Sequence, residues 1–294
     1  MAINLGSNSI EDVKLGNLQV EKIYLEDEVV WQKTSPVSVN ALKFSSTGSQ
    51  TLGIDTTKLG TITPVFEYST DGETWTSWTV LDTLSFGNGT DLYIRGMNTF
   101  LSKGGINYTN FVFSTASPVE CSGNIMHLFD YTQDLTAIPD ESGQSRGVKY
   151  MFANCTQLIT APDLPATTLV IYAYSNMFEG CTSLEIPPFL PATNTTTSNY
   201  AYYNMFKNCT SLNTLPSLNH LVTPSAGICV YMFDGCSNIK MSGVQDEEYV
   251  NEYTFGFLPD GSSCQGMFAN TGGSMTGLSS YPITIYTSNN IRLS

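Results

Sequence analysis

The sequence predicts a mainly β protein with short helices, in which a small N-terminal β anchor and a β-sandwich precede a C-terminal solenoid of repeats. Three observations support this prediction. Leucine recurs about every ten residues over 1–33, apolar and polar residues alternate between turn signals over 37–118, and nearly the same phrase recurs from residue 151 onward. The middle segment shows no helical period, which favours strands.

The first 33 residues are predicted to anchor the protein. Short β segments joined by turns fit their spacing, but so short a segment cannot build a self-standing core. We therefore expect it to pair with other chains or to pack on a partner surface, with the polar stretch 32–36 as a linker. The apolar residues assigned to this anchoring role are Leu5, Ile10, Leu15, Val20, Leu25 and Trp31.

Residues 37–118 are predicted to form a small β-sandwich. Apolar and polar residues alternate over 39–44, and similar strand-like runs recur at 65–68, 92–95 and 108–113. Asp-Gly at 71–72 separates two β-prone runs and predicts a hairpin, because such a turn requires positive φ. Strands divided by turn signals are typical of a sandwich.

Residues 123–294 are predicted to form the solenoid. The phrase Met-Phe-x-(Gly/Asn)-Cys begins at Met151, Met177, Met205 and Met232, with spacings of 26, 28 and 27 residues. Repeats of this size stack because one unit cannot bury its apolar face without its neighbours. We expect a degraded first copy at 124–130, an acidic loop at 245–249, a fifth copy from Met267 and a closing strand within 283–293.

Within one repeat, the spacing of Tyr174, Met177 and Phe178 predicts one buried face of a short helical turn. The Gly or Asn before each Cys is expected to adopt a left-handed conformation and end that turn. The cysteines are predicted to form a ladder of buried free thiols. Their odd number of seven and the lack of a readable export signal argue against disulfides, and two histidines with no Cys-x-x-Cys argue against zinc.

Composition excludes several classes of partner. A chain with 41% hydrophobic and 13% charged residues should fold. Its net charge of −14, without a basic stripe, argues against nucleic-acid binding. No apolar run approaches the roughly 20 residues that span a bilayer, so we expect no membrane insertion. The N-terminus lacks the basic and apolar regions of a signal peptide, and we expect assembly in the cytoplasm.

The sequence predicts no catalytic, cofactor or metal site. None of the common phosphate-binding, zinc-protease or serine-hydrolase motifs is present. Asp246, Glu247 and Glu248 could suggest the paired carboxylates of a glycosidase, but an acidic run is more typical of a solvated loop. Tyr200 and Tyr203, beside 195–198, are the candidate surface-binding residues; they could form a platform for sugars or a protein contact, or simply pack.

The repeat resembles a known family. Phe-x-(Gly/Asn)-Cys-Thr-Ser-Leu followed by Pro-x-Leu-Pro-Ala-Thr is similar to the BspA-like leucine-rich repeat over roughly residues 123–285. The Met-Phe form, the segment 164–168 and the order of anchor, Tyr-Ser-x-Asp-Gly-x-x-Trp module and repeats resemble structural proteins of gut bacteriophages, including crAss-like phages. The resemblance implies a surface or adhesion protein without catalytic residues. The fourth and fifth repeats depart from it, because they lack Leu-Pro-Ala-Thr.

Two functions from different classes therefore remain open. The leading hypothesis is a non-enzymatic virion protein on the particle surface, either a capsid-decorating or head-fibre protein or a tail-fibre-like one. It would bind other virion proteins through its N-terminal segment, form a homo-oligomer with a trimer favoured, and contact a host surface glycan or protein. The alternative is a bacterial BspA-like cell-surface adhesin. A glycan-degrading enzyme is a third and weaker hypothesis.

Overall fold

A computed structural model describes the backbone of residues 13–15, 18–20, 22–25 and 28–32, and residues 39–293 except 141, 142, 194, 196, 197 and 289. The chain divides into two compact units, Met1–Val39 and Asn40–Ser294. It is mainly β: the helical elements of the described residues are two 3-10 helices, η1 (Thr56–Lys58) and η2 (Ile125–Leu128). This confirms the predicted class. Within the described residues, no helix has the length and apolar character to cross a bilayer.

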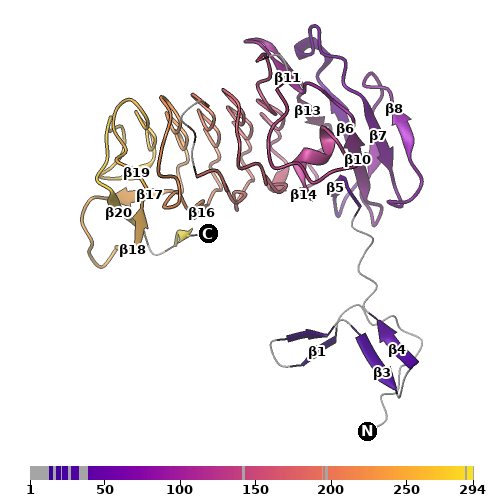
Figure 1. The fold of residues 1–294 in the computed structure, drawn as a ribbon. Coiled ribbons are helices and arrows are strands. Elements are labelled where there is room, and N and C mark those ends of the chain that lie inside the picture. Colours follow the sequence, from indigo (N-terminus) through magenta and orange to yellow (C-terminus); the bar gives the residue numbers. More distant parts are fainter. Residues whose placement is uncertain are drawn as a thin grey trace. The chain divides into compact units, whose positions relative to one another are not determined.

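The N-terminal unit contains two β-hairpins (Figure 1). Strand β1 (Val13–Leu15) pairs with β2 (Leu18–Val20), and β3 (Lys22–Leu25) pairs with β4 (Glu28–Gln32). The predicted anchoring residues Leu15, Val20, Leu25 and Trp31 lie in these four strands, whereas Leu5 and Ile10 lie outside the described residues.

The second unit begins with two sheets that pack through an aromatic core. The larger sheet has the strand order β15-β14-β5-β10-β7-β8 and the smaller one β13-β6-β9. Phe44 of the larger sheet contacts Phe86, Phe111 and Phe113 of the smaller one, with ring centroids 5.9 to 6.4 Å apart. The strands are β5 (Leu42–Ser45), β6 (Gln50–Ile54), β7 (Phe66–Ser69), β8 (Thr76–Trp78), β9 (Leu84–Phe86), β10 (Leu92–Gly96), β13 (Phe111–Phe113), β14 (Val119–Ser122) and β15 (Leu158–Thr160).

The predicted Asp-Gly hairpin is confirmed between β7 and β8, which pair antiparallel. Gly72 has a φ of 77°, which a glycine adopts without steric cost. The Asp71 carboxylate accepts hydrogen bonds from the Ser69 hydroxyl and from the backbone N–H groups of Glu73 and Thr74, at 2.7 to 2.8 Å. These bonds hold the pKa of Asp71 well below its usual range. Asp71 and Gly72 therefore close this loop structurally.

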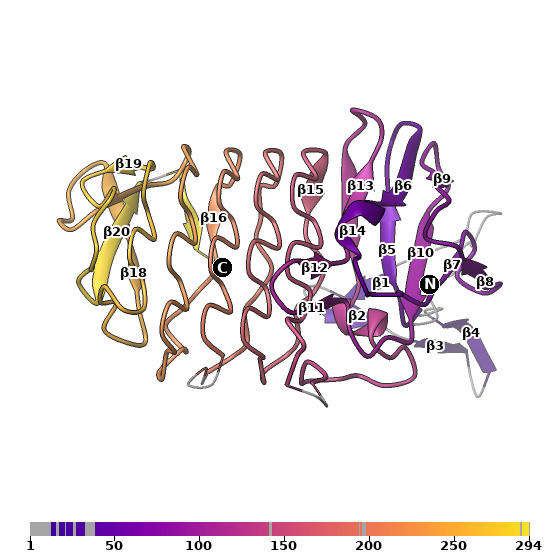
Figure 2. The same ribbon diagram turned by 90° about the horizontal axis from the view of Figure 1, so that it is seen from above.

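Most of the remaining chain of this unit consists of repeat segments that lie side by side in sequence order (Figure 2). Backbone hydrogen bonds join each segment to the next. We number segments 1 to 5 by Met151, Met177, Met205, Met232 and Met267. The N–H of Phe152 in segment 1 donates to the C=O of Met177 in segment 2 at 2.9 Å, and the equivalent bond recurs between each following pair. The intervening N–H groups close tight turns within their own segment. The N–H groups that bond to the next segment and those that close the turns thus have hydrogen-bond partners without a helix or a long sheet.

The short helical turn predicted for 174–178 is wrong. Positive φ recurs at every fourth residue, at Tyr172 (59°), Asn176 (56°) and Gly180 (74°) in segment 2, and with the same spacing in segments 3 and 4. A right-handed helix requires negative φ throughout, so each such residue interrupts it. The burial of the Tyr, Met and Phe side chains is as predicted. The left-handed conformation is also confirmed before the cysteine, at Asn154, Gly180, Asn208 and Gly235.

A stack of phenylalanine rings forms the centre of the repeats. The rings of segments 1 to 5 lie within 10° of parallel, with centroids 5.5 to 5.6 Å apart, and all are fully buried. Phe111 of the smaller sheet contacts Phe152 at one end at 5.5 Å, and Tyr281 covers Phe268 edge-on at the other at 5.4 Å. The two sheets and the repeats thus share one core. Strand β14, at the predicted boundary of 118–123, joins them by pairing with β5 and with β15.

The predicted ladder of buried free thiols is confirmed, since all seven cysteines are buried and unpaired. The structure adds a reason for cysteine at this position. The thiols of segments 2 to 4 donate to the phenylalanine carbonyl of the preceding segment: Cys181 to that of Phe152 at 3.0 Å, Cys209 to that of Phe178 at 3.1 Å and Cys236 to that of Phe206 at 2.9 Å. Burial raises the pKa of these thiols. They are therefore small core residues that also donate a hydrogen bond between segments.

A four-stranded sheet closes the C-terminal end, in the order β18-β20-β17-β19. The acidic insertion forms an exposed loop between β17 (Lys240–Ser242) and β18 (Tyr249–Thr254), as expected. The closing strand is also confirmed, as β20 (Thr284–Ser288). The other short strands are β11 (Ser102–Lys103) paired with β12 (Asn107–Tyr108), β16 (Thr214–Leu215) paired with β21 (Arg292–Leu293), and β19 (Gly272–Gly273).

Candidate functional site

Four tyrosines of the repeats occupy left-handed backbone positions. Tyr150, Tyr172, Tyr200 and Tyr231 have φ values of 58°, 59°, 60° and 53°. For a residue with a Cβ this conformation costs about 1–2 kcal/mol, and at equivalent positions the chain elsewhere uses Asn or Gly. Bulky residues at strained positions point to a role in function or packing.

Tyr150, Tyr172 and Tyr200 belong, with Tyr108 and Tyr203, to a tyrosine row made of two groups of contacting rings. The Tyr108 and Tyr150 rings stack at 4.6 Å, and those of Tyr172 and Tyr200 at 5.2 Å. Tyr203 meets Tyr200 edge-on at 5.9 Å. All five rings are half-buried. The structure thus brings the two predicted residues, Tyr200 and Tyr203, together and stacks Tyr172 on Tyr200, while Tyr108 and Tyr150 form the second group. The sequence prediction selected neither Tyr172 nor this second group.

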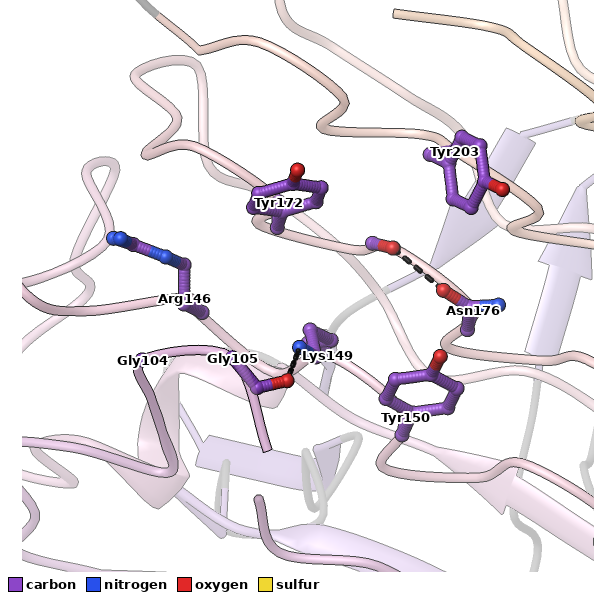
Figure 3. Close-up of a pocket in the computed structure, with 9 residues that line it drawn as sticks. Gly104, Gly105, Arg146, Lys149, Tyr150, Tyr172, Asn176 and Tyr203 are labelled. Atoms are coloured by element: carbon purple, nitrogen blue, oxygen red, sulfur yellow. Dashed lines mark hydrogen bonds between the residues drawn. The ribbon is translucent and has the colours of Figure 1, made fainter. Parts of the chain in front are cut away.

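A buried lysine lies between the two stacked pairs. The Lys149 ammonium is 5.3 Å from the Tyr150 ring centroid and 5.7 Å from that of Tyr172, and donates to the Gly105 carbonyl at 2.7 Å (Figure 3). The residue is only 6% exposed. Burial, and then the like charge of Arg146, lower the pKa of Lys149 below its usual value. The ammonium therefore lies in an environment that disfavours its own charge.

These residues surround a pocket of about 300 Å³. The Asn176 side chain crosses one wall: its Nδ2 donates to the Glu179 carboxylate at 2.6 Å, and its Oδ1 lies 2.6 Å from the Ser175 hydroxyl. Burial, and then the Glu179 charge, raise the pKa of the Tyr150 hydroxyl. The pocket therefore has cations on one side and a carboxylate near the other. Its lining residues are Gly104, Gly105, Arg146, Lys149, Tyr150, Tyr172, Ser175, Asn176 and Tyr203.

A second lysine on the repeats provides a direct comparison. Lys207 lies 5.9 Å from the Tyr231 ring centroid, and its ammonium pairs with the Asp234 carboxylate at 3.0 Å. That bond and charge raise the pKa of Lys207 despite its partial burial. No described carboxylate lies within 4.0 Å of the Lys149 ammonium, by contrast. Lys149 is therefore placed to attract an anion, whereas Lys207 already has one.

The two histidines and the acidic run 246–248 do not line this pocket. In the described part of the chain, no three His, Cys, Asp or Glu side chains gather as a metal site would require. His127 contacts Asp134 at 3.1 Å, and His220 contacts the Leu190 carbonyl; neither lines the pocket. Asp246 accepts the backbone N–H groups of Glu248 and Tyr249, so the acidic run includes a tightly turned loop.

Comparison of the chain with protein-family models, curated proteins and solved structures yields no match.

Proposed function

We propose that this is a non-enzymatic structural protein displayed on the surface of a bacteriophage particle, as a capsid-decorating or head-fibre protein or as a tail-fibre-like one. In this proposal the N-terminal hairpins bind other virion proteins, the two packed sheets are a small β-sandwich, and the repeats are a BspA-like leucine-rich repeat solenoid. The protein assembles as a homo-oligomer, with a trimer favoured, and contacts a host surface through its repeats.

One observation carries this proposal: a small hairpin unit, Met1–Val39, precedes a compact unit of 255 residues, Asn40–Ser294. The first is too short for a core of its own. In the second, a single phenylalanine stack runs from Phe152 to Phe268, and Phe111 of the smaller sheet contacts its first ring. In a continuous stack of repeats, each repeat is stabilised by contacts with its nearest neighbours, and the stack offers an extended face to a partner. A short attachment segment followed by a rigid exposed domain is the arrangement that a particle-surface protein requires.

The tyrosine row supports the contact role. Tyrosines combine a large apolar surface with a polar hydroxyl, which makes them frequent at binding surfaces. The Tyr200 and Tyr203 rings lie perpendicular to each other, at 83°. Together with Tyr172, which stacks on Tyr200, they form one half-buried aromatic surface, to which a sugar or a protein could bind.

Electron microscopy of particles with and without this protein tests the proposal. We expect particles assembled without it to lack a surface projection, and complementation with the full chain to restore it. A chain lacking residues 1–33 should fold but fail to restore the projection. Unchanged heads and tails in its absence would refute the proposal. Recovery of the protein in the envelope of uninfected bacteria would instead support the adhesin alternative.

A further inference from the structure

We propose that the pocket around Lys149 binds a carboxylated sugar, such as a hexuronic or sialic acid unit at the end of a glycan. This inference rests on the proposed display function and names the chemistry of the ligand that the tyrosine face would recognise.

The charge of the ligand follows from the environment of Lys149. A buried ammonium is expensive unless it is paired, and here the charge that acts on it is the like charge of Arg146, which also lines the pocket. One carbonyl, that of Gly105, accepts one of the three ammonium protons. A ligand carboxylate would supply the missing counter-charge through charge-assisted hydrogen bonds. Cations placed this way in a chain of net charge −14 favour an anion at this point of the surface.

The sugar character follows from the remaining walls. The Tyr150, Tyr172 and Tyr203 rings line the pocket and can cover the C–H face of a pyranose. Ser175 and Asn176 offer polar atoms to ring hydroxyls, and the Glu179 carboxylate bound to Asn176 is an acceptor near the same wall. A ligand with a single negative charge at one end and neutral hydroxyls at the other matches this distribution better than a multiply charged phosphate.

The size of the pocket limits the ligand to one sugar unit. Its volume of about 300 Å³ lies at the lower end of the range for small-molecule sites, about 300–1,000 Å³. A protein partner would need a surface of about 800 Å² per side. The pocket is therefore expected to recognise one terminal or exposed acidic unit of a longer glycan, with the neighbouring Tyr200 beside it.

Titration calorimetry of the full chain with methyl glucuronide, N-acetylneuraminic acid and methyl glucoside tests this inference. We expect at least one acidic sugar to bind about tenfold or more tightly than the neutral glucoside, because only the acids pair with Lys149. Lys149→Met should remove this preference. Lys207→Met is the matched control, because it removes a lysine beside a tyrosine that is already paired with Asp234, and the preference should survive.

A thermal melt of each variant shows that it is folded. The inference is overturned if the folded wild type binds neither acid, if it binds acidic and neutral sugars equally, or if Lys149→Met leaves the preference intact. Imaging of particles keeps the two proposals separable. If the protein binds an acidic sugar but is absent from particles, only the proposed function is contradicted. If the protein is present on particles but binds no acidic sugar, only this inference is contradicted.

Discussion

Replacing Phe206 with alanine should destabilise the whole unit Asn40–Ser294, because its ring lies in the middle of the phenylalanine stack. It is fully buried, and its centroid lies 5.6 Å from those of both Phe178 and Phe233. Its removal leaves a cavity and breaks two stacked pairs. The two neighbouring rings cannot close the gap while the backbone bonds between segments hold their spacing.

The expected magnitude can be divided into two parts. A buried Phe→Ala change costs about 3–5 kcal/mol in the free energy of unfolding. Aromatic pairs contribute about 0.5–1.5 kcal/mol each beyond burial, so the two pairs account for roughly 1–3 kcal/mol of this. Phe206→Leu retains most of the buried apolar surface and should cost about that smaller amount. Phe189→Ala is the control: this ring is 60% exposed, and the change should cost less than about 1 kcal/mol.

Equilibrium urea unfolding measures these differences. Far-UV circular dichroism follows the unit as a whole, while tryptophan fluorescence includes Trp78, whose ring stacks on Phe111 at 6.4 Å. Since Phe111 adjoins the first ring of the stack, both signals should shift together for Phe206→Ala. A shift no larger than that of the Phe189 control, or a shift in one signal alone, would refute the idea of one continuous core.

Three further changes test other parts of the account. Cys209→Ala should lower the free energy of unfolding by about 1–2 kcal/mol, because the thiol's hydrogen bond to the Phe178 carbonyl and its packing are lost. In the wild type, a thiol reagent should modify Cys209 only after urea unfolding, and rapid labelling of the folded protein would contradict this. Gly235→Ala should lower the free energy of unfolding by about 1–3 kcal/mol in the same assay, because the φ of Gly235 is 76° and the new Cβ would clash with the Asn208 side chain. Asn208→Gly is the control: at a φ of 61°, this change should alter stability by less than about 1 kcal/mol. Lys149→Met should raise the melting temperature at pH 7. The pKa of Lys149 in the folded protein lies below its ordinary value of 10.5, so the charged ammonium opposes folding. This destabilisation fades as the pH rises from the folded pKa toward 10.5, because the lysine then loses its proton in the folded state. The gap between variant and wild type should therefore shrink over that range, and a constant gap would contradict the assigned cause.

The sequence pattern predicts the features that depend on local chemistry or on repetition. The Asp71-Gly72 pair specifies a hairpin, because few other residues accept the φ of that turn. Recurrence of Phe and Cys predicts their burial, since equivalent positions of stacked units face one core. The same logic places the left-handed residue before Cys181 and Cys209.

Other features depend on contacts between distant residues and could not be predicted. The spacing of Tyr174, Met177 and Phe178 fits a helical face, yet hydrogen bonds to the next segment favour a chain of tight turns instead. Tyr150 and Tyr172 occupy left-handed positions at which Asn or Gly is sterically favoured. Tyrosine at these positions is explained only by the stacking of its ring on another tyrosine. Lys149 resembles any surface lysine in the sequence. What distinguishes it is its burial and its hydrogen bond to the Gly105 carbonyl, 44 residues away in the chain.

The most direct test of the central claim is immunogold electron microscopy of purified phage particles, with antibodies raised against residues 40–294. A displayed virion protein predicts label on intact particles at one structural location, and no label on particles assembled without the protein. Label confined to the envelope of uninfected bacteria, with none on the particles, would contradict the account.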